Sequence, residues 1–143
     1  MNQIQLGDQI IRSDKEQTRR AYAAMTSGSA ERCGCSYCRN FIAQRSTAYP
    51  ENFRLLLDQL GIDPQKEGEV YEGSPECSLM EYGGWFYLTG ELVEAGERMT
   101  DAGSGFEYFF RESHSPTNLE FGESVLALEF SIKLPWVPVG DDF

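Results

Sequence analysis

Hydrophobic positions in the first half of the chain recur with the period of an α-helix. The clearest stripe repeats at i, i+3, i+4 and i+7, and it consists of Phe53, Leu56, Leu57 and Leu60. Pro50 before this stripe and Gly61 after it are typical helix boundaries. The pattern therefore predicts a helix over about residues 50–61, with the stripe turned toward the core.

Two further helices are predicted upstream. A second stripe predicts a helix over about residues 37–48, and it is formed by Cys38, Phe41, Ile42, Arg45 and Tyr49. The Ser13-x-x-Glu16 spacing is that of a capping box, in which the two side chains satisfy backbone N–H groups at a helix start. It predicts a helix from there to Met25. The apolar stripe of this helix is thin, so we expect it to pack at an edge of the fold.

Beyond residue 64 the apolar positions alternate with polar ones, as they do in β-strands. The longest alternation runs from Val125 to Leu134, and its apolar side is formed by Leu126, Leu128, Phe130, Ile132 and Leu134. This pattern predicts a strand with one buried and one solvated face. Shorter strands are predicted at residues 70–71, 79–82, 85–93 and 106–110. Turns are predicted at Gly83-Gly84 and at residues 101–105, and a short hairpin at residues 4–11.

The order of these elements predicts the fold class. The helices come first and the strands follow without alternating with them, which is typical of an α+β domain. We expect an antiparallel sheet of four to six strands with about three N-terminal helices packed on one face. The chain is expected to form a single domain over residues 1–143, with its helical part at about 13–61 and its sheet part at about 69–136. A helical unit separate from an all-β unit is the alternative.

Composition and charge narrow the classes of function. The 143 residues carry 12 basic and 23 acidic side chains, which gives a net charge of −11. Because phosphate contacts need clustered Lys and Arg, this balance argues against nucleic acid as the main partner. The chain has no run of 18 apolar residues and shows no secretory signal, so we expect a cytoplasmic protein with no membrane partner. A homo-oligomer is left open.

The chemical capacity of the chain is concentrated in one short segment. Cys33, Cys35 and Cys38 supply three thiols within six residues, which is the compactness of a zinc-binding loop. These three residues are the predicted metal ligands, with zinc as the metal. The fourth position would be filled by Cys77, by His114 or by water. Reduced-thiol chemistry and buried structural cysteines are the alternatives.

The reactivity of Cys38 depends on two opposing effects. If Ser36 caps the following helix, Cys38 lies in the first turn beside Arg39, where the partial positive charge of the helix end lowers a thiol pKa. Burial on the apolar stripe raises the same pKa. A stripe position at the head of an amphipathic helix favours burial, and hence an inert thiol.

Three other sequence features give weaker indications of a functional site. His114 is the single histidine, and its loop composition favours solvent exposure over a role as ligand or general base. An acidic stretch without calcium-loop spacing favours solvated charge, and it comprises Glu67, Glu69, Glu72 and Glu76. The tetrapeptide from Cys35 to Cys38 resembles the active-site motif of glutaredoxins, but the βαβ pattern of that fold is absent.

The chain also resembles a group of small bacterial proteins to which no activity is assigned. The group shares the motif Cys-Gly-Cys-x-x-Cys-Arg-Asn-Phe. Here the matching segments run from Cys33 to Phe41, from Leu57 to Pro64, from Tyr82 to Phe86 and from Leu128 to Val137. The resemblance implies a common fold and a bacterial origin.

Two classes of function therefore stay open. In the first, the protein is a binding or interaction module with a structural cysteine loop, and its working surface is the solvated sheet face or a cleft between helices and sheet. In the second, it is a thiol- or metal-dependent enzyme acting at Cys38. The scarcity of partner residues for catalysis favours the first class.

Overall fold

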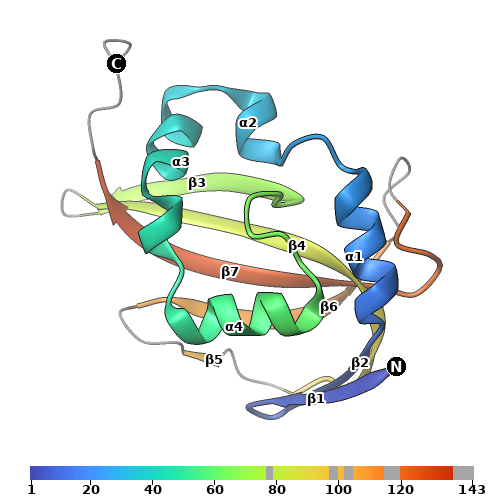
Figure 1. The fold of residues 1–143 in the computed structure, drawn as a ribbon. Helices are drawn as coiled ribbons and strands as arrows, with labels where there is room; N and C mark the ends of the chain where they lie inside the picture. Colours follow the sequence, from blue (N-terminus) through green and yellow to red (C-terminus); the bar gives the residue numbers. More distant parts are fainter. Residues whose placement is uncertain (77–78, 97–99, 102–104, 115–119, 137–143) are drawn as a thin grey trace.

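The computed structural model describes residues 1–76, 79–96, 100–101, 105–114 and 120–136 (Figure 1). Its helices are α1 (Lys15–Ala24), α2 (Ser29–Cys33), α3 (Ser36–Ala48) and α4 (Glu51–Leu60). Its strands are β1 (Asn2–Leu6), β2 (Gln9–Ser13), β3 (Glu69–Glu76), β4 (Leu79–Glu94), β5 (Thr100–Asp101), β6 (Glu107–Ser113) and β7 (Val125–Pro135). In the described part of the chain, no helix has the length and apolar character needed to cross a membrane.

All of these strands belong to one antiparallel sheet. Its order is β1-β2-β4-β7-β6-β5, and β3 pairs with β4 beside this path. The predicted α+β class and antiparallel sheet are confirmed. Among the described residues the sheet has seven strands, one more than the largest number expected, because an N-terminal hairpin joins one edge and the two-residue β5 joins the other.

The N-terminal hairpin predicted at residues 4–11 is confirmed and is slightly longer. Gly7, at φ +59°, makes the turn between β1 and β2. The hairpin continues the sheet because Ser13 of β2 lies opposite Gly90 of β4. Sheet structure therefore begins at residue 2, well before the expected start at residue 69.

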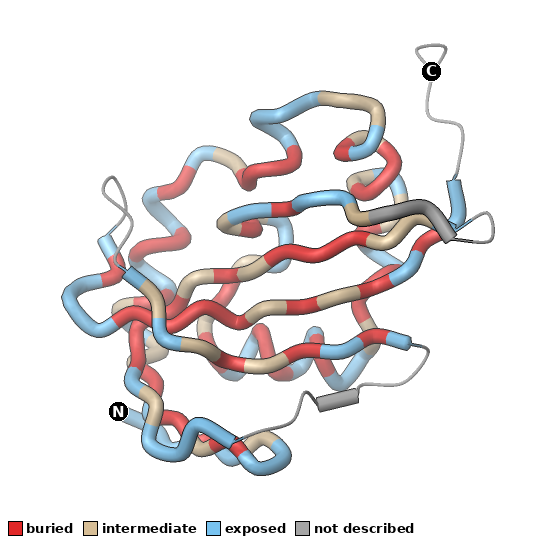
Figure 2. The backbone as a smooth tube through the Cα atoms, turned by 180° about the vertical axis from the view of Figure 1, so that it is seen from behind, coloured by how far each residue is buried: buried red, intermediate tan, exposed pale blue. Residues whose placement is uncertain are grey.

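The helices cover one face of the sheet, with the core between the two layers. Figure 1 shows the helices in front of the strands, and Figure 2 shows the bare strands from behind. The predicted stripe of α4 is buried. The Phe53 ring of α4 lies 4.7 Å from the Phe106 ring and 6.1 Å from the Phe130 ring of β7, measured between centroids. The α4 stripe therefore faces the core, as predicted, and its Phe53 ring packs on the apolar side of β7.

The opposite face of the sheet is more exposed. Along β7, Glu129 and Ser131 are partly exposed and Lys133 is exposed, whereas the residues between them are buried (Figure 2). This confirms the alternation predicted for this strand. On the same face, the guanidinium of Arg111 lies 5.2 Å from the centre of the Trp85 ring.

The turn predicted at Gly83-Gly84 is wrong, because β4 runs through both glycines without a break. A Cβ atom on Gly83 would lie 2.4 Å from the Tyr71 ring, and one on Gly84 would lie 2.5 Å from the carbonyl oxygen of Glu69. Glycine is needed here because β3 and its side chains approach β4 closely. The two predicted strands at 79–82 and 85–93 are therefore one strand.

The start of α1 also differs from the prediction. Ser13 is the last residue of β2, and the N-cap is Asp14, whose carboxylate accepts a hydrogen bond from the amide of Gln17 at 3.1 Å. The Asp14 carboxylate caps the helix in place of the Ser13 hydroxyl, and its negative charge interacts favourably with the helix start. The short helix α2 was not predicted, because five residues give too little sequence for a period to show.

A side-chain amide links two strands that are not neighbours in the sheet order. The buried Gln9 of β2 accepts a hydrogen bond from the Phe110 amide of β6 at 2.8 Å. Its own amide group donates to the carbonyl oxygens of Phe110 at 2.7 Å and of Ala95 at 2.8 Å. The Gln9 amide therefore pairs with Phe110 as a backbone peptide group of an adjacent strand would.

Candidate metal centre

The three cysteines that lie close together in the sequence sit where the chain turns from α2 into α3. Cys33 is the last residue of α2, and Cys35 is the N-cap of α3. Gly34 between them has φ +67°, a left-handed conformation that glycine adopts without strain. Cys38 lies in the first turn of α3. The reversal at Gly34 therefore brings the end of one helix to the start of the next.

The helix cap predicted at Ser36 is wrong, because Cys35 has that role. Cys35 has the extended backbone of an N-cap, with φ −73° and ψ 168°, and Ser36 is already helical. The sulfur of Cys35 accepts a hydrogen bond from the Cys38 amide at 3.4 Å. The Cys35 sulfur therefore lies at the positive end of the α3 dipole, the position that the sequence had suggested for Cys38.

The sulfur atoms of Cys33, Cys35 and Cys38 all lie within 4.8 Å of one another, and we call these residues the cysteine cluster. In a tetrahedral zinc site with Zn–S bonds of about 2.3 Å, neighbouring sulfurs are about 3.8 Å apart. The cluster therefore needs to contract by no more than about 1 Å to match that geometry. Exposure falls from Cys33, which is exposed, through Cys35 to Cys38, which is buried.

The local environment separates the pKa values of two of these thiols. Burial raises the pKa of Cys38 well above its ordinary value, and hydrogen bonds to its neighbouring thiols add to the rise. Burial also raises the pKa of Cys35, but hydrogen bonds from the Cys38 and Tyr37 amides and with the other two thiols outweigh it, so that the pKa is lowered overall. This agrees with the inert Cys38 thiol that its stripe position favours.

The start of α3 is anchored on the end of the sheet. The Asn40 side chain donates to the carbonyl oxygen of Pro135 at 3.2 Å and to the Tyr82 hydroxyl at 3.0 Å. That hydroxyl donates to the carbonyl oxygen of Tyr37 at 2.8 Å. The cysteine cluster therefore lies near the Pro135 end of β7.

This placement separates His114 from the cluster. His114 is exposed and directly follows Ser113, which pairs with Val125 at the opposite end of β7. Ten residue steps along a strand separate Val125 from Pro135, a length of roughly 33 Å. His114 is therefore not the fourth ligand of this cluster. Cys77, the other predicted candidate, lies outside the described residues.

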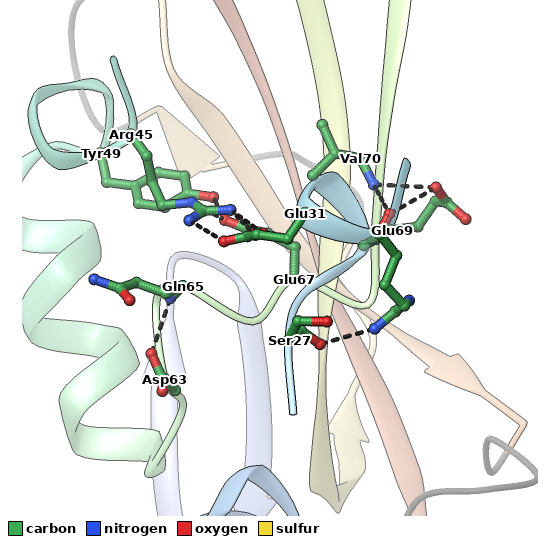
Figure 3. A network of polar contacts seen from close by, with 11 residues as sticks. Ser27, Glu31, Arg45, Tyr49, Asp63, Gln65, Glu67, Glu69 and Val70 are labelled. Carbon is green, nitrogen blue, oxygen red and sulfur yellow. Dashed lines mark hydrogen bonds and ion pairs between the residues drawn. The ribbon is translucent and has the colours of Figure 1, made fainter. Parts of the chain in front are cut away.

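A partly buried ionic network links the two helices that carry the cysteine cluster, α2 and α3 (Figure 3). The guanidinium of Arg45 binds both oxygens of Glu31, at 2.8 and 2.9 Å, and both oxygens of Glu67, at 2.9 and 3.1 Å. The Tyr49 hydroxyl donates to Glu67 at 2.7 Å. We call these four residues the Arg45 network. It joins α2, through Glu31, to α3 and to the segment that precedes β3.

The expectation that the acidic stretch is solvated is wrong for Glu67, whose side chain is fully buried. A buried carboxylate needs hydrogen bonds and a counter-charge, and Arg45 and Tyr49 supply them. Burial raises the pKa of Glu67, whereas the bonds from Arg45 hold the pKa of the more exposed Glu31 below its ordinary value. The presence of Arg45 on an apolar stripe was the signal in the sequence that a buried carboxylate must lie nearby.

Comparison of the chain with protein-family models, with curated proteins and with solved structures finds no match. The resemblance to the bacterial group that shares the cysteine motif therefore stays a prediction. What the site can do is inferred from the geometry of the cysteine cluster alone.

Proposed function

We propose that this chain is a small binding or interaction protein in which Cys33, Cys35 and Cys38 hold one zinc ion. The observation that carries the proposal is the convergence of their three sulfur atoms within 4.8 Å. Thiolates are the ligands that favour zinc over harder cations such as Mg²⁺ and Ca²⁺. Zinc at this point ties the end of α2 to the start of α3, so its role is structural.

A structural zinc site has four ligands, so one more is required. The position of His114 leaves Cys77 or water for the fourth place. Glu76 pairs with Leu79, and Leu79 pairs with Pro135, at the end of the sheet where α3 is anchored. Glu76 and Leu79 therefore lie at the same end of the sheet as the cluster, and Cys77 is the first fourth ligand to test.

The open face of the sheet is the proposed working surface of the module. Tyr71, Trp85 and Tyr87 follow one another across β3 and β4, with ring centroids 6.2 and 6.5 Å apart. Beside them, Arg111 pairs with Glu129 at 3.0 Å. Aromatic rings framed by charged groups are common in recognition surfaces, and this supports a binding role.

The alternative of a thiol-dependent enzyme acting at Cys38 receives less support. A nucleophilic cysteine needs an accessible thiolate, whereas Cys38 is buried and its thiol pKa is raised. His114, the single histidine, lies at the far end of β7 and cannot serve as its base. The zinc proposal explains the same residues without these partners.

The metal content of the purified protein tests the proposal. Protein prepared without chelators should contain about one equivalent of zinc per chain by elemental analysis, and a chelator should lower its melting temperature. Cys35→Ser should lose the metal, because it removes the thiolate at the N-cap of α3, between the other two ligands in the sequence. A metal-free preparation that binds no added zinc, and whose melting is unchanged by chelator, would show that the cysteines are structural thiols only.

The same measurement on Cys77→Ser identifies the fourth ligand. If Cys77 binds, this variant should lose affinity for zinc by about 10-fold or more. Unchanged affinity would assign the fourth position to water. Ser46→Ala, a small change at an exposed position of α3, is the control variant and should bind zinc as wild type does.

A further inference from the structure

The predicted ligands come from two different helices, so their convergence depends on how these helices are held together. Cys33 belongs to α2, whereas Cys35 and Cys38 belong to the start of α3. A helix of five residues is not stable by itself, because nucleation fixes several residues for one hydrogen bond. Contacts outside α2 must therefore hold Cys33 in place.

The first residue of α2 is one such contact. The Ser29 amide donates to the carbonyl oxygen of Glu67 at 3.0 Å, and the Ser29 hydroxyl donates to the Glu69 carboxylate at 3.0 Å. The hydroxyl also accepts from the Val70 amide at 3.3 Å. These bonds attach the beginning of α2 to the start of β3, but they lie four residues away from Cys33.

The second contact lies between Ser29 and Cys33 and is ionic. Glu31 receives two parallel hydrogen bonds from Arg45, one to each carboxylate oxygen (Figure 3). Arg45 is itself fixed, because its other side binds the buried Glu67 and its guanidinium lies 5.8 Å from the centre of the Phe41 ring. The planar, bidentate geometry of an arginine–carboxylate pair restricts orientation as well as distance.

The position of this pair on α3 matches that of the metal ligands. Arg45 and Cys38 are seven residues apart, so they lie on the same face of α3, about 10 Å apart along its axis. Glu31 and Cys33 are two residues apart on α2. Contact of Glu31 with Arg45 therefore holds α2 against the face of α3 that carries Cys38. The reversal at Gly34 connects the end of α2 to the start of α3 directly after Cys33.

We propose that the bidentate Glu31–Arg45 pair is a positioning device for Cys33, and that it decides whether Cys33 joins Cys35 and Cys38 at the metal. This inference rests on the proposed metal-binding function. Without the pair, α2 stays attached at its beginning through Ser29 and the buried Ala30, and at its end through the chain at Gly34. The half of α2 that carries Cys33 then loses its side-chain tie to α3, and the exposed Cys33 thiol turns toward solvent. Cys35 and Cys38 remain a two-thiolate site, since both lie at the start of α3.

Cobalt(II) is the probe for this inference, because it occupies tetrahedral thiolate sites and absorbs in proportion to the number of bound thiolates. Four proteins are titrated: wild type, Glu31→Gln, Cys33→Ser and the double variant. Glu31→Gln should weaken cobalt binding by about 10- to 100-fold, as loss of an outer contact of a metal ligand does. Its sulfur-to-cobalt absorption should fall to the intensity of Cys33→Ser, because both variants lose the Cys33 thiolate.

The double variant separates positioning from general stability. In the Cys33→Ser background, Glu31→Gln should change cobalt affinity by less than about 2-fold, since the ligand that Glu31 positions is already absent. The matched control is Glu16→Gln, which removes an exposed carboxylate 3.3 Å from Arg19 and should leave cobalt binding unchanged. Circular dichroism of each metal-free variant verifies the fold. If Glu31→Gln does not fold, Glu31→Asp replaces it under the same criteria.

The outcomes distinguish this inference from the proposed function. Wild-type protein without a sulfur-to-cobalt band would contradict metal binding itself. A sulfur-to-cobalt band in wild type that is unchanged in Glu31→Gln would overturn the positioning role alone. Equal losses of affinity in the wild-type and Cys33→Ser backgrounds would also overturn it, because the effect would then be independent of Cys33.

Discussion

The Tyr49 hydroxyl donates a 2.7 Å hydrogen bond to a Glu67 carboxylate that has no exposed surface. The same carboxylate receives two bonds from Arg45, so its charge is matched inside the core. Buried ions tolerate little loss of such partners, because an unpaired buried charge is strongly destabilising. The Arg45 network is therefore sensitive to small changes in side-chain chemistry.

Removal of the Tyr49 hydroxyl should have a measurable effect. Tyr49→Phe should lower the free energy of unfolding by about 1.5–3 kcal/mol, the range for a hydrogen bond to a charged group. Tyr22→Phe is the matched control, because Tyr22 is also buried but donates to a neutral acceptor, the carbonyl oxygen of Tyr87, at 2.7 Å. Its loss should be about 0.5–1.5 kcal/mol. Urea titration gives both values, and a smaller loss for Tyr49→Phe than for Tyr22→Phe would contradict the charged pairing.

Packing of β7 against the helices gives a second prediction. Leu128 is fully buried between Phe86 and Phe110 of the flanking strands, so Leu128→Ala should lower the free energy of unfolding by about 2–5 kcal/mol. Lys133→Ala, on the other face of the same strand, should change it by less than about 0.5 kcal/mol. Similar losses for the two variants would be incompatible with the observed alternation.

Zinc removal should destabilise the protein by an amount that depends on free zinc. At a free zinc concentration 100 times the dissociation constant, bound metal adds about 2.7 kcal/mol to the free energy of unfolding. The chelated protein should lose this increment, and Cys35→Ser should show no response to chelator. His114→Ala should bind zinc as wild type does, because His114 lies at the far end of β7. Weaker binding by His114→Ala would place this histidine at the metal, contrary to the structure.

Thiol labelling should follow the environments of the cysteines. In metal-free protein at pH 7, Cys35 should be alkylated while the protein is folded, because it is partly exposed and its thiol pKa is lowered. Cys38 should react only upon unfolding, because it is buried and its pKa is raised. Peptide mapping after timed exposure to iodoacetamide measures both rates. Fast labelling of Cys38 in the folded protein would revive the enzyme hypothesis.

Acid should remove the contribution of Glu31 to stability. The bonds from Arg45 lower the pKa of Glu31 in the folded state below the unfolded value of about 4.3. The contribution is therefore complete above that unfolded value, and it is lost as the pH falls through the lower, folded value. Metal-free wild type should be more stable than Glu31→Gln at pH 7, and the difference should shrink toward pH 3. A difference that is constant with pH would contradict a charged Glu31–Arg45 pair.

Sequence periodicity correctly predicted the elements whose buried face can be recognised from the residues of that element alone. The α4 stripe from Phe53 to Leu60 and the alternation of β7 are both buried as expected, because each pattern is contained within one element. Gly83-Gly84 was misassigned because glycine marks both turns and places where another strand approaches closely. Only the pairing of β3 with β4 decides between the two.

The sequence predicted the three thiols of the candidate site, but not the residues that surround them. The spacing from Cys33 to Cys38 indicated that the thiols converge, since a six-residue segment cannot separate them far. The partners of Arg45 lie 14 and 22 residues away in the sequence. The chain has 23 acidic residues, and the sequence does not indicate which of them contact Arg45. The separation of His114 from the cluster depends on the strand order, which periodicity does not contain.

The pairing of the Gln9 side chain with Phe110 has a consequence for the behaviour of the chain in a crowded solution. An unpaired N–H and C=O on an outer strand form a template onto which a strand of another molecule can add. At Phe110 both groups are already occupied by one amide, so that position of β6 offers no template. A single side chain thus protects this part of the sheet from intermolecular strand addition, the first step toward β-aggregation.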